Sequence, residues 1–326
     1  MKVLKVFLLL IVILFAGSAI AGGIVVKNML QPVNPVASEN TRFVIPKGQA
    51  IGTIGTRLTD AGLIKNTWVF RILVKQAQVE SKIQAGSFLL SANMTPAQII
   101  REMTKGTDDI WITLLEGWRR EEMAESLVKL ELPNFDPQEF LDLTKDQEGY
   151  LFPDSYLVNK GIDTQGIVDL LTSTFDKKVK VGLAAKIKES GKPLNELVTI
   201  ASLLEREAKG LQEMRTVSGI LWNRVGIGMA LNVDATLQYI NGFNKVQQAW
   251  WSPPLAIDKA KESPFNTYIY AGIPPSPICN PGLDALTAAA DPAKTDYLYY
   301  LHDPKGMIHY GKTLPEHNAN VQRYLR

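Results

Sequence analysis

The 326-residue chain has few of the residues from which metal sites and cross-links are built. It contains a single cysteine, Cys279, and three histidines. One cysteine excludes an internal disulfide and a cysteine-based zinc site, and three histidines leave little for another metal centre. Excess charge is also missing, since 35 Lys and Arg residues balance 33 Asp and Glu residues, which argues against a nucleic-acid binder held by bulk charge. We therefore expect chemistry that needs neither a metal nor another cofactor.

The rest of the composition is typical of a globular protein. Hydrophobic residues make up 46% and charged residues 21% of the chain. These fractions exclude a disordered, collagenous or multi-span membrane protein. Because 326 residues exceed the length of an average domain, we expect two folded units.

The amino terminus predicts a membrane anchor. Lys2 and Lys5 precede an uncharged stretch, Val6–Val26, which has about the twenty apolar residues that a membrane-crossing helix needs. Lysines before such a span favour a cytoplasmic amino terminus with the remaining chain exported. The alternative is a signal peptide cleaved after Ala19–Ala21. We favour an uncleaved single-pass anchor over 1–27 in the inner membrane, because the apolar sequence continues beyond that site.

The residues after the anchor predict a linker and a small α+β domain. The segment 28–40 contains two prolines and has no apolar periodicity, as in a linker. Over 41–108 we expect strands at Thr41–Ile45 and near Gly86–Leu90, and helices after Gly48, at Trp68–Gln78 and at Thr95–Thr104. Val44–Gly48, followed by Ile54 and Leu58, resembles a LysM module, a unit that binds N-acetylglucosamine polymers. The alternative is a spacer that holds the next domain away from the membrane.

A second strand–turn–helix pattern opens the larger unit. It begins with the strand candidate Trp111–Leu115 and continues into a helix around Met123–Leu130. We place this unit at 109–326. The fold class predicted for the whole chain is α+β, with an N-terminal transmembrane helix, a LysM-like α/β domain next to the membrane, and a mixed α+β domain that carries the chemistry.

The clearest chemical signal is a pair of glutamates on an apolar helix. Residues 197–208 project as a helix whose broad apolar arc includes Glu205 and Glu207. Thr199, Ser202, Arg206 and Lys209 fill the opposite, polar side. Burial raises the pKa of a carboxyl group, which lets a glutamic acid keep its proton near neutral pH and act as a general acid. Small neighbours leave room for a substrate beside Glu205, whereas Glu207 is expected to pair with a cation or cap backbone. The alternative is that both are salt-bridged at a domain seam.

Polar side chains gather in the segments that follow this helix. Amides, hydroxyls and tyrosines on proline-stiffened loops suit a sugar, which offers hydroxyl groups and one apolar face. The candidate substrate-binding residues are Asn223, Asp234, Thr236, Tyr239, Asn266 and Tyr268. The alternative is that the prolines and glycines only shape surface turns. Trp250 and Trp251 have two open roles, as a platform for a sugar or as a cover for the hydrophobic core.

Several phrases of the sequence resemble those of one family. Glu148–Tyr156 reads EGYLFPDSY, like the family phrase EGyLfPdTY, and Ala201–Ala208 resembles its helix ASIvEkEa. Ser263–Gly282 resembles its tpYNTY…GLPPgPI.NPG stretch. Further likenesses lie at Ala288–Pro292, Tyr297–Tyr300 and Glu316–Asn318. Together these phrases run from about residue 40 to the end of the chain, and the sequence is similar to the YceG-like family, the endolytic murein transglycosylases of bacterial inner membranes.

This resemblance implies a lytic transglycosylase whose second unit lies in the periplasm and acts on peptidoglycan glycan strands. The catalytic glutamate of the family, the first of its EkE pair, falls on Glu205. The implied reaction cleaves the β-1,4 bond between N-acetylmuramic acid and N-acetylglucosamine and leaves a 1,6-anhydro end. Glu205 acts first as acid and then as base, so that no second carboxylate is needed. Asp234 is expected to hold sugar or backbone.

The resemblance also implies a role in cell-wall assembly, in which the enzyme ends glycan elongation and associates with cell-wall synthases. Two other functions stay open. A hydrolytic muramidase would use the same site and add water to the cleaved bond. A non-catalytic peptidoglycan-binding scaffold would keep the anchor and the LysM-like domain without chemistry at Glu205.

Overall fold

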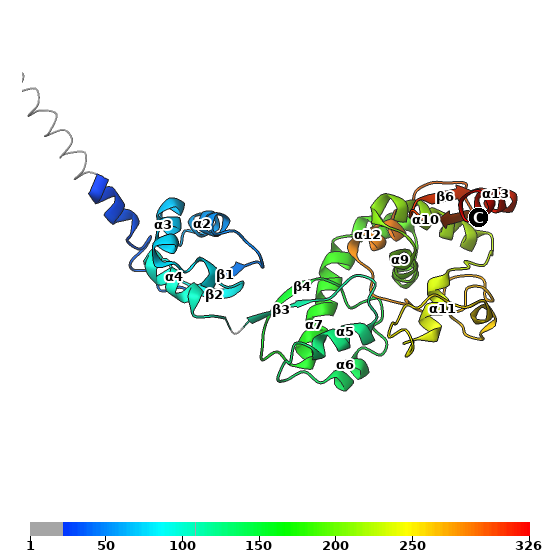
Figure 1. Cartoon of the computed structure of the whole chain (residues 1–326), viewed down its shortest axis with the longest axis horizontal. Coiled ribbons are helices and arrows are strands. Elements are labelled where there is room, and N and C mark those ends of the chain that lie inside the picture. The colour runs from blue at the N-terminus through cyan, green and yellow to red at the C-terminus, as the bar shows by residue number, and fades with distance from the viewer. Residues whose placement is uncertain (1–21, 108) are drawn as a thin grey trace, which may run out of the picture. The chain divides into compact units, whose positions relative to one another are not determined.

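The computed structural model describes residues 22–107 and 109–326, and the chain divides into two compact units (Figure 1). The first unit ends at Trp111 and also takes in Leu157–Lys160. The second comprises Ile112–Tyr156 and Gly161–Arg326. Both contain helices and short strands, so the predicted mixed α+β character is correct.

The prediction of a transmembrane helix is wrong for the part of the chain that the structure describes. Within 22–107 and 109–326, no helix combines the length and the apolar character that a bilayer span requires. The prediction rested on the apolar composition of 6–26, and residues 1–21 lie outside the described residues.

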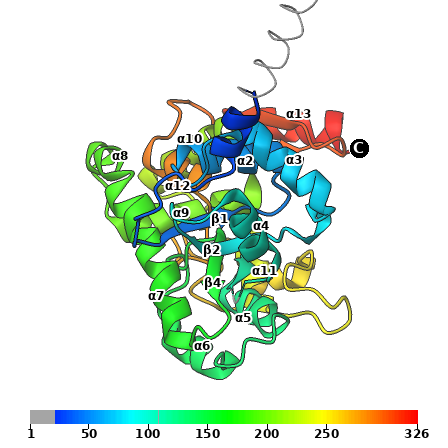
Figure 2. The ribbon, with the colours of Figure 1, turned by 90° about the vertical axis from the view of Figure 1, so that its left-hand side faces the viewer.

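The first unit is a small α+β domain. It contains β1 (Thr41–Ile45), α2 (Ile51–Asp60), α3 (Thr67–Ala77), the 3-10 helix η1 (Glu80–Lys82), β2 (Gly86–Leu90) and α4 (Pro96–Thr104). β1 and β2 lie side by side (Figure 2) and pair antiparallel, and the register places Thr41 opposite Leu90. α4 begins at the predicted cap, because the Thr95 hydroxyl accepts the backbone N–H of Gln98. The buried core includes Phe43, Ile54, Leu58, Phe70, Ile99 and Met103.

The second unit is larger and mainly helical. Its helices are α5 (Arg120–Val128), α6 (Pro137–Leu143), α7 (Thr164–Phe175), the π-helix η2 (Asp176–Val181), α8 (Ala184–Ser190), α9 (Leu194–Glu207), α10 (Gly210–Gly226), α11 (Asp234–Asn241), the 3-10 helix η3 (Ala256–Ala260), α12 (Leu283–Ala290) and α13 (Leu314–Tyr324). Strand β3 (Asp109–Thr113) pairs with β4 (Ser155–Asn159), and β5 (Tyr299–His302) pairs antiparallel with β6 (Ile308–Gly311). The division of the chain passes through β3 and β4.

Helix α9 lies at the centre of the second unit. It packs against α10 and α12 (Figure 1), and every side chain from Leu197 to Leu204 is buried. The expected polar side of this helix is therefore not solvated over this length. Thr199 donates its hydroxyl to the Asn195 carbonyl. Ser202 donates to the Thr199 carbonyl and accepts a backbone N–H from the 276–282 loop. Because both hydroxyls are satisfied internally, they can be buried at little cost.

Candidate active site

Glu205 lies in the last turn of α9, where the helix emerges from the core. Its side chain is half-buried, and Oε2 accepts the backbone N–H of Gly282 at 2.9 Å. The pKa of Glu205 is raised to about 7, mainly by burial and in smaller part by the negative charges of Glu116 and Asp284. The Gly282 hydrogen bond and the Arg206 charge oppose this rise without cancelling it. Both the acid and the carboxylate are therefore populated at neutral pH.

Gly282 brings a second carboxyl group close to Glu205. It is the residue before α12, and a Cβ placed on it would lie 1.9 Å from Oε1 of Glu116. Only glycine allows the Glu116 side chain to cover this peptide. Asp284 follows in the first turn of α12. The Gly282 N–H that donates to Glu205 thus lies near the carboxyl groups of Glu116 and Asp284, whose negative charges disfavour ionisation of Glu205.

A buried amide holds the loop that presents Gly282. Asn280 is fully buried, and its Oδ1 accepts the backbone N–H groups of Gly149 at 2.9 Å and Leu151 at 3.0 Å. Its Nδ2 donates to Oε1 of Glu148 at 2.8 Å and to the carbonyl of Trp118 at 3.1 Å. One side chain therefore joins three separate segments of the unit and sets the position of the loop.

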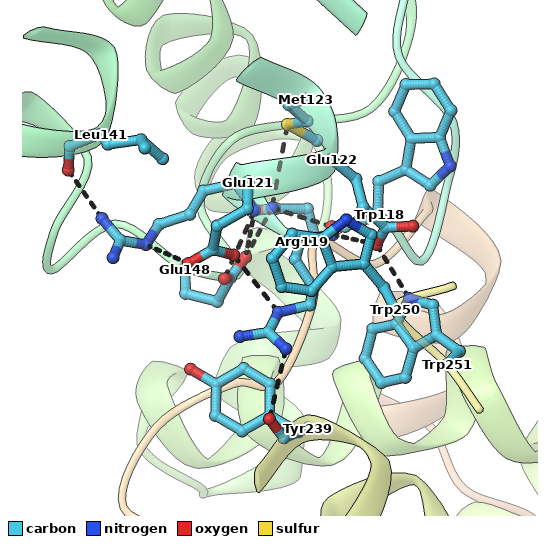
Figure 3. A network of polar contacts seen from close by, with 12 residues as sticks. Trp118, Arg119, Glu121, Glu122, Met123, Leu141, Glu148, Tyr239, Trp250 and Trp251 are labelled. Atoms are coloured by element: carbon cyan, nitrogen blue, oxygen red, sulfur yellow. Dashed lines mark hydrogen bonds and ion pairs between the residues drawn. The ribbon is translucent and has the colours of Figure 1, made fainter. Parts of the chain in front are cut away.

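Glu148 is a second acid with an altered pKa, deeper in the same region. It lies below α5 in the polar network of Figure 3, where it is buried. It accepts the backbone N–H of Arg120 in addition to the Asn280 amide. Burial raises the pKa of Glu148 to about 8 despite the nearby Arg119 and Arg120. The residue is therefore mainly protonated at neutral pH. Its neighbours are protein groups, so we assign it a structural role.

Arginine and tryptophan side chains interleave beside Glu205. Trp251 donates its indole N–H to Glu122 at 2.8 Å, and the Arg206 guanidinium lies 4.1 Å from the centroid of its ring. Arg119 lies over both Tyr239 and Trp250, at 4.3 and 4.9 Å (Figure 3). Each indole has a hydrogen-bond partner, because Trp250 donates to Glu125 at 3.2 Å. The two tryptophans thus attach their loop to α5 and to the end of α9.

Three of the predicted substrate-binding residues have accessible polar groups or lie near this region. Tyr268 donates its hydroxyl to Oδ1 of the exposed Asp234 at 2.5 Å, at the start of α11. Tyr239, at the end of α11, lies between Arg119 and the ring of Phe265, 4.9 Å away. Their contact with a sugar stays a prediction.

The other three predicted substrate-binding residues donate hydrogen bonds to protein carbonyls. Asn266 is fully buried and donates to the carbonyls of Lys259 and Lys261, which orders its loop. Thr236 is also fully buried, and its hydroxyl donates to a backbone carbonyl of its own segment. Asn223 donates to the carbonyls of residues 295 and 297. These hydrogen bonds position the loops that the side chains belong to, and contact of the three residues with a sugar stays a prediction.

Several residues of the site were not predicted from the sequence. Glu116 and Asp284 lie far from Glu205 along the chain, and nothing in their local sequence indicates that they meet it. Gly282, Glu148 and Asn280 had a signal, since all three belong to phrases that resemble the family, but these phrases do not show that Gly282 donates to Glu205. Within the described residues, no group of three or more His, Cys, Asp or Glu side chains could hold a metal ion.

Comparisons with known proteins identify the family of this chain. An endolytic murein transglycosylase of Bacillus subtilis is 29% identical over 92% of this chain and 89% of its own length. An endolytic murein transglycosylase of Streptococcus pneumoniae is 25% identical over 98% of this chain, and the chain spans 64% of that relative's length. The crystal structure of a YceG-like protein from Listeria monocytogenes superposes with a TM-score of 0.58 at 27% identity, covering 86% of this chain and 99% of that one. The profile of the YceG-like family matches residues 43–323. The chain belongs to the YceG-like family.

Proposed function

We propose that this chain is an endolytic peptidoglycan lytic transglycosylase. It cleaves the β-1,4 bond between N-acetylmuramic acid and N-acetylglucosamine within glycan strands and leaves 1,6-anhydro ends. The relatives named above support the reaction class. The observation that carries the proposal is the carboxyl group of Glu205, whose pKa of about 7 suits an acid that must later act as a base.

The reaction needs one proton-transferring group. Protonated Glu205 donates to the bridging oxygen as the bond from that oxygen to C1 of the muramyl ring breaks and an oxocarbenium-like transition state develops. The carboxylate that remains is stabilised by the backbone N–H of Gly282 and by the positive charge of Arg206. It then accepts the proton of the muramyl C6 hydroxyl as that oxygen bonds to C1. Glu205 is therefore protonated again at the end of the reaction, as it was at the start, and no water is consumed.

A hydrolytic muramidase is the second candidate, and one observation favours it. Glu116 and Asp284 lie close enough to Glu205 to raise its pKa by their charge. A second carboxylate near the acid is what a hydrolase uses to activate water or to attack the sugar. If the chain is a transglycosylase, the carboxylates of Glu116 and Asp284 instead keep Glu205 protonated.

We place the reaction outside the cytoplasm, where peptidoglycan lies, and we propose that the first unit binds glycan as a LysM-like module. The order strand, two helices, strand and the antiparallel pairing of β1 with β2 support this assignment. The exposed Trp68, stacked with Arg71 at 5.0 Å, lines a hollow of about 440 Å³ between α2 and α3. Aromatic rings of this kind pack well on the apolar face of a sugar. A role in ending glycan elongation beside cell-wall synthases is a further part of the proposal.

The decisive experiment compares the purified chain with its Glu205→Gln variant on isolated glycan strands, with product masses read. We expect 1,6-anhydro ends from the wild type and a loss of about 10²- to 10⁴-fold in the variant. Glu207→Gln is the matched control, because it changes a carboxyl two residues away on the same helix and can still accept the Tyr300 hydroxyl. Products one water heavier would instead assign the chain as a muramidase. Cleavage by Glu205→Gln at the wild-type rate would refute both.

A further inference from the structure

Arg206 is a half-buried cation with unused donors. Its guanidinium lies against the face of Trp251, and its Nε is buried without a hydrogen-bond partner. Among the described residues, no side chain or carbonyl pairs with its terminal nitrogens, and no carboxylate comes within ion-pair distance. Buried polar groups normally have partners, so a guanidinium in this state is available to an acceptor from outside.

Two other arginines of this unit have acceptors in the protein, although Nε of Arg119, like that of Arg206, is buried without a hydrogen bond. Arg119 pairs with Glu121 at 3.2 Å and donates to the Tyr239 carbonyl at 3.2 Å. Arg224 donates to backbone carbonyls at 2.6 Å on two sides. Arg206 differs from both, although it lies in the same polar region. A general shortage of acceptors therefore does not explain its unused donors.

The position of Arg206 places those donors beside the proposed acid. A Cβ built on Gly117 would lie 3.1 Å from Nη1 of Arg206 and 3.4 Å from Cγ of Glu205. The two side chains thus flank the same point of the backbone. A ligand group held by Arg206 would be within one sugar ring of a bond protonated by Glu205. The planar fork of a guanidinium matches a carboxylate with two parallel hydrogen bonds.

We propose that Arg206 binds a carboxylate of the muramyl residue and so selects acidic glycans over neutral ones. This inference rests on the proposed function and names the substrate class of the same site. Each muramyl ring carries a lactyl acid on C3, close to the C1 atom at which cleavage occurs. In strands without peptides this acid is a free carboxylate, and in intact strands it is amide-linked to a peptide that carries its own carboxylates. Both sources offer the same chemistry to Arg206.

The test measures glycan binding in the Glu205→Gln background, so that no cleavage occurs. Arg206→Met removes the charge and the donors while keeping an apolar side chain against Trp251. Arg206→Lys keeps the charge and loses the fork. Lys209→Met is the matched control, because it removes an exposed positive charge near the same end of α9. Each variant is titrated with peptide-free glycan, with the same glycan after its carboxylates are converted to methylamides, and with glycan that retains its peptides.

Arg206→Met should weaken binding of the free-carboxylate glycan by about 10- to 100-fold, the usual range for a hydrogen bond to a charged group. Binding of the methylamide glycan should be almost unchanged, Arg206→Lys should fall between, and Lys209→Met should resemble the parent. A loss confined to the peptide-bearing glycan would assign the peptide as the source of the carboxylate. Equal effects on charged and neutral glycans would overturn the proposal, and thermal melting of Arg206→Lys checks that the fold is intact.

Failure of the proposed function gives a different result. If the wild-type chain cleaved none of these glycans, the enzyme assignment would fall. Carboxylate-dependent binding through Arg206 would then still be measurable, and would still decide the inference.

Discussion

Replacing Glu205 with glutamine should stabilise the second unit in mildly alkaline solution, even though it removes the proposed acid. Burial raises the pKa of this carboxyl from 4.5 to about 7, so that ionisation costs more in the folded chain than in the unfolded chain. One pKa unit corresponds to about 1.4 kcal/mol, and the whole shift therefore to roughly 3 kcal/mol at most. Glutamine carries no charge at any pH, and its carbonyl oxygen can still accept the Gly282 N–H.

The pH at which this gain appears follows from the two pKa values. Below pH 4.5 the carboxyl of Glu205 is protonated in both the folded and the unfolded chain, and the variant gains nothing. Between pH 4.5 and about 7 the unfolded chain releases its proton while the folded chain retains it, so the wild type loses stability as the pH rises. Above pH 7 the loss is complete. At that pH the free energy of unfolding of the variant should exceed that of the wild type by about 1–3 kcal/mol.

Urea unfolding at pH 5 and pH 8, followed by tryptophan fluorescence, measures this difference. Other groups titrate over the same range, so the quantity compared is the free energy of unfolding of the variant minus that of the wild type at each pH. Glu189→Gln, at an exposed position on α8, is the control and should show no such change. If the advantage of Glu205→Gln did not grow between pH 5 and pH 8, the pocket would not retain the proton, and the mechanism would lose its acid.

Three other perturbations probe the same site. The cleavage rate kcat/KM should fall about tenfold per pH unit above pH 7, because protonated Glu205 is lost. Glu116→Gln should move this fall to lower pH, because it removes a charge that raises the pKa of Glu205. Asn280→Ala should lower the free energy of unfolding in urea by about 3 kcal/mol and reduce cleavage, since it leaves buried groups unpaired. Gly149→Ala should lower the free energy of unfolding by more than Asn280→Ala, because Gly149 has φ +88° and an added Cβ would lie 2.5 Å from Pro277. A Gly149→Ala variant with the wild-type melting temperature would contradict this.

Local patterns were sufficient for the strands and the main helices of the first unit. The strands Thr41–Ile45 and Gly86–Leu90 and the helix beginning after Thr95 follow from alternation, turn residues and a cap, all of which act within a few residues. The polar side assigned to α9 was wrong at Thr199 and Ser202. A helical projection records which residues are polar, but it does not record whether a hydroxyl finds a partner inside the fold.

The site was only partly accessible to the same reasoning. Glu205 could be singled out because it is an acid on an apolar arc. Gly282 and Glu116 could not, since they reach Glu205 through loops whose path depends on the buried amide of Asn280. Asn266 was chosen for its chemical type, but the sequence does not show that its amide is used by its own loop.

The contrast between Glu205 and Glu207 explains why one of two neighbouring acids can be the catalyst. Burial raises the pKa of both. Glu207 accepts the Tyr300 hydroxyl at 2.8 Å and is also stabilised by the backbone of Ala235. Glu205 has one protein donor, Gly282, on Oε2, and among the described residues its Oε1 forms no hydrogen bond. An acid that serves a substrate needs an oxygen without a protein partner. Glu205 keeps such an oxygen, whereas Glu207 accepts from two protein donors.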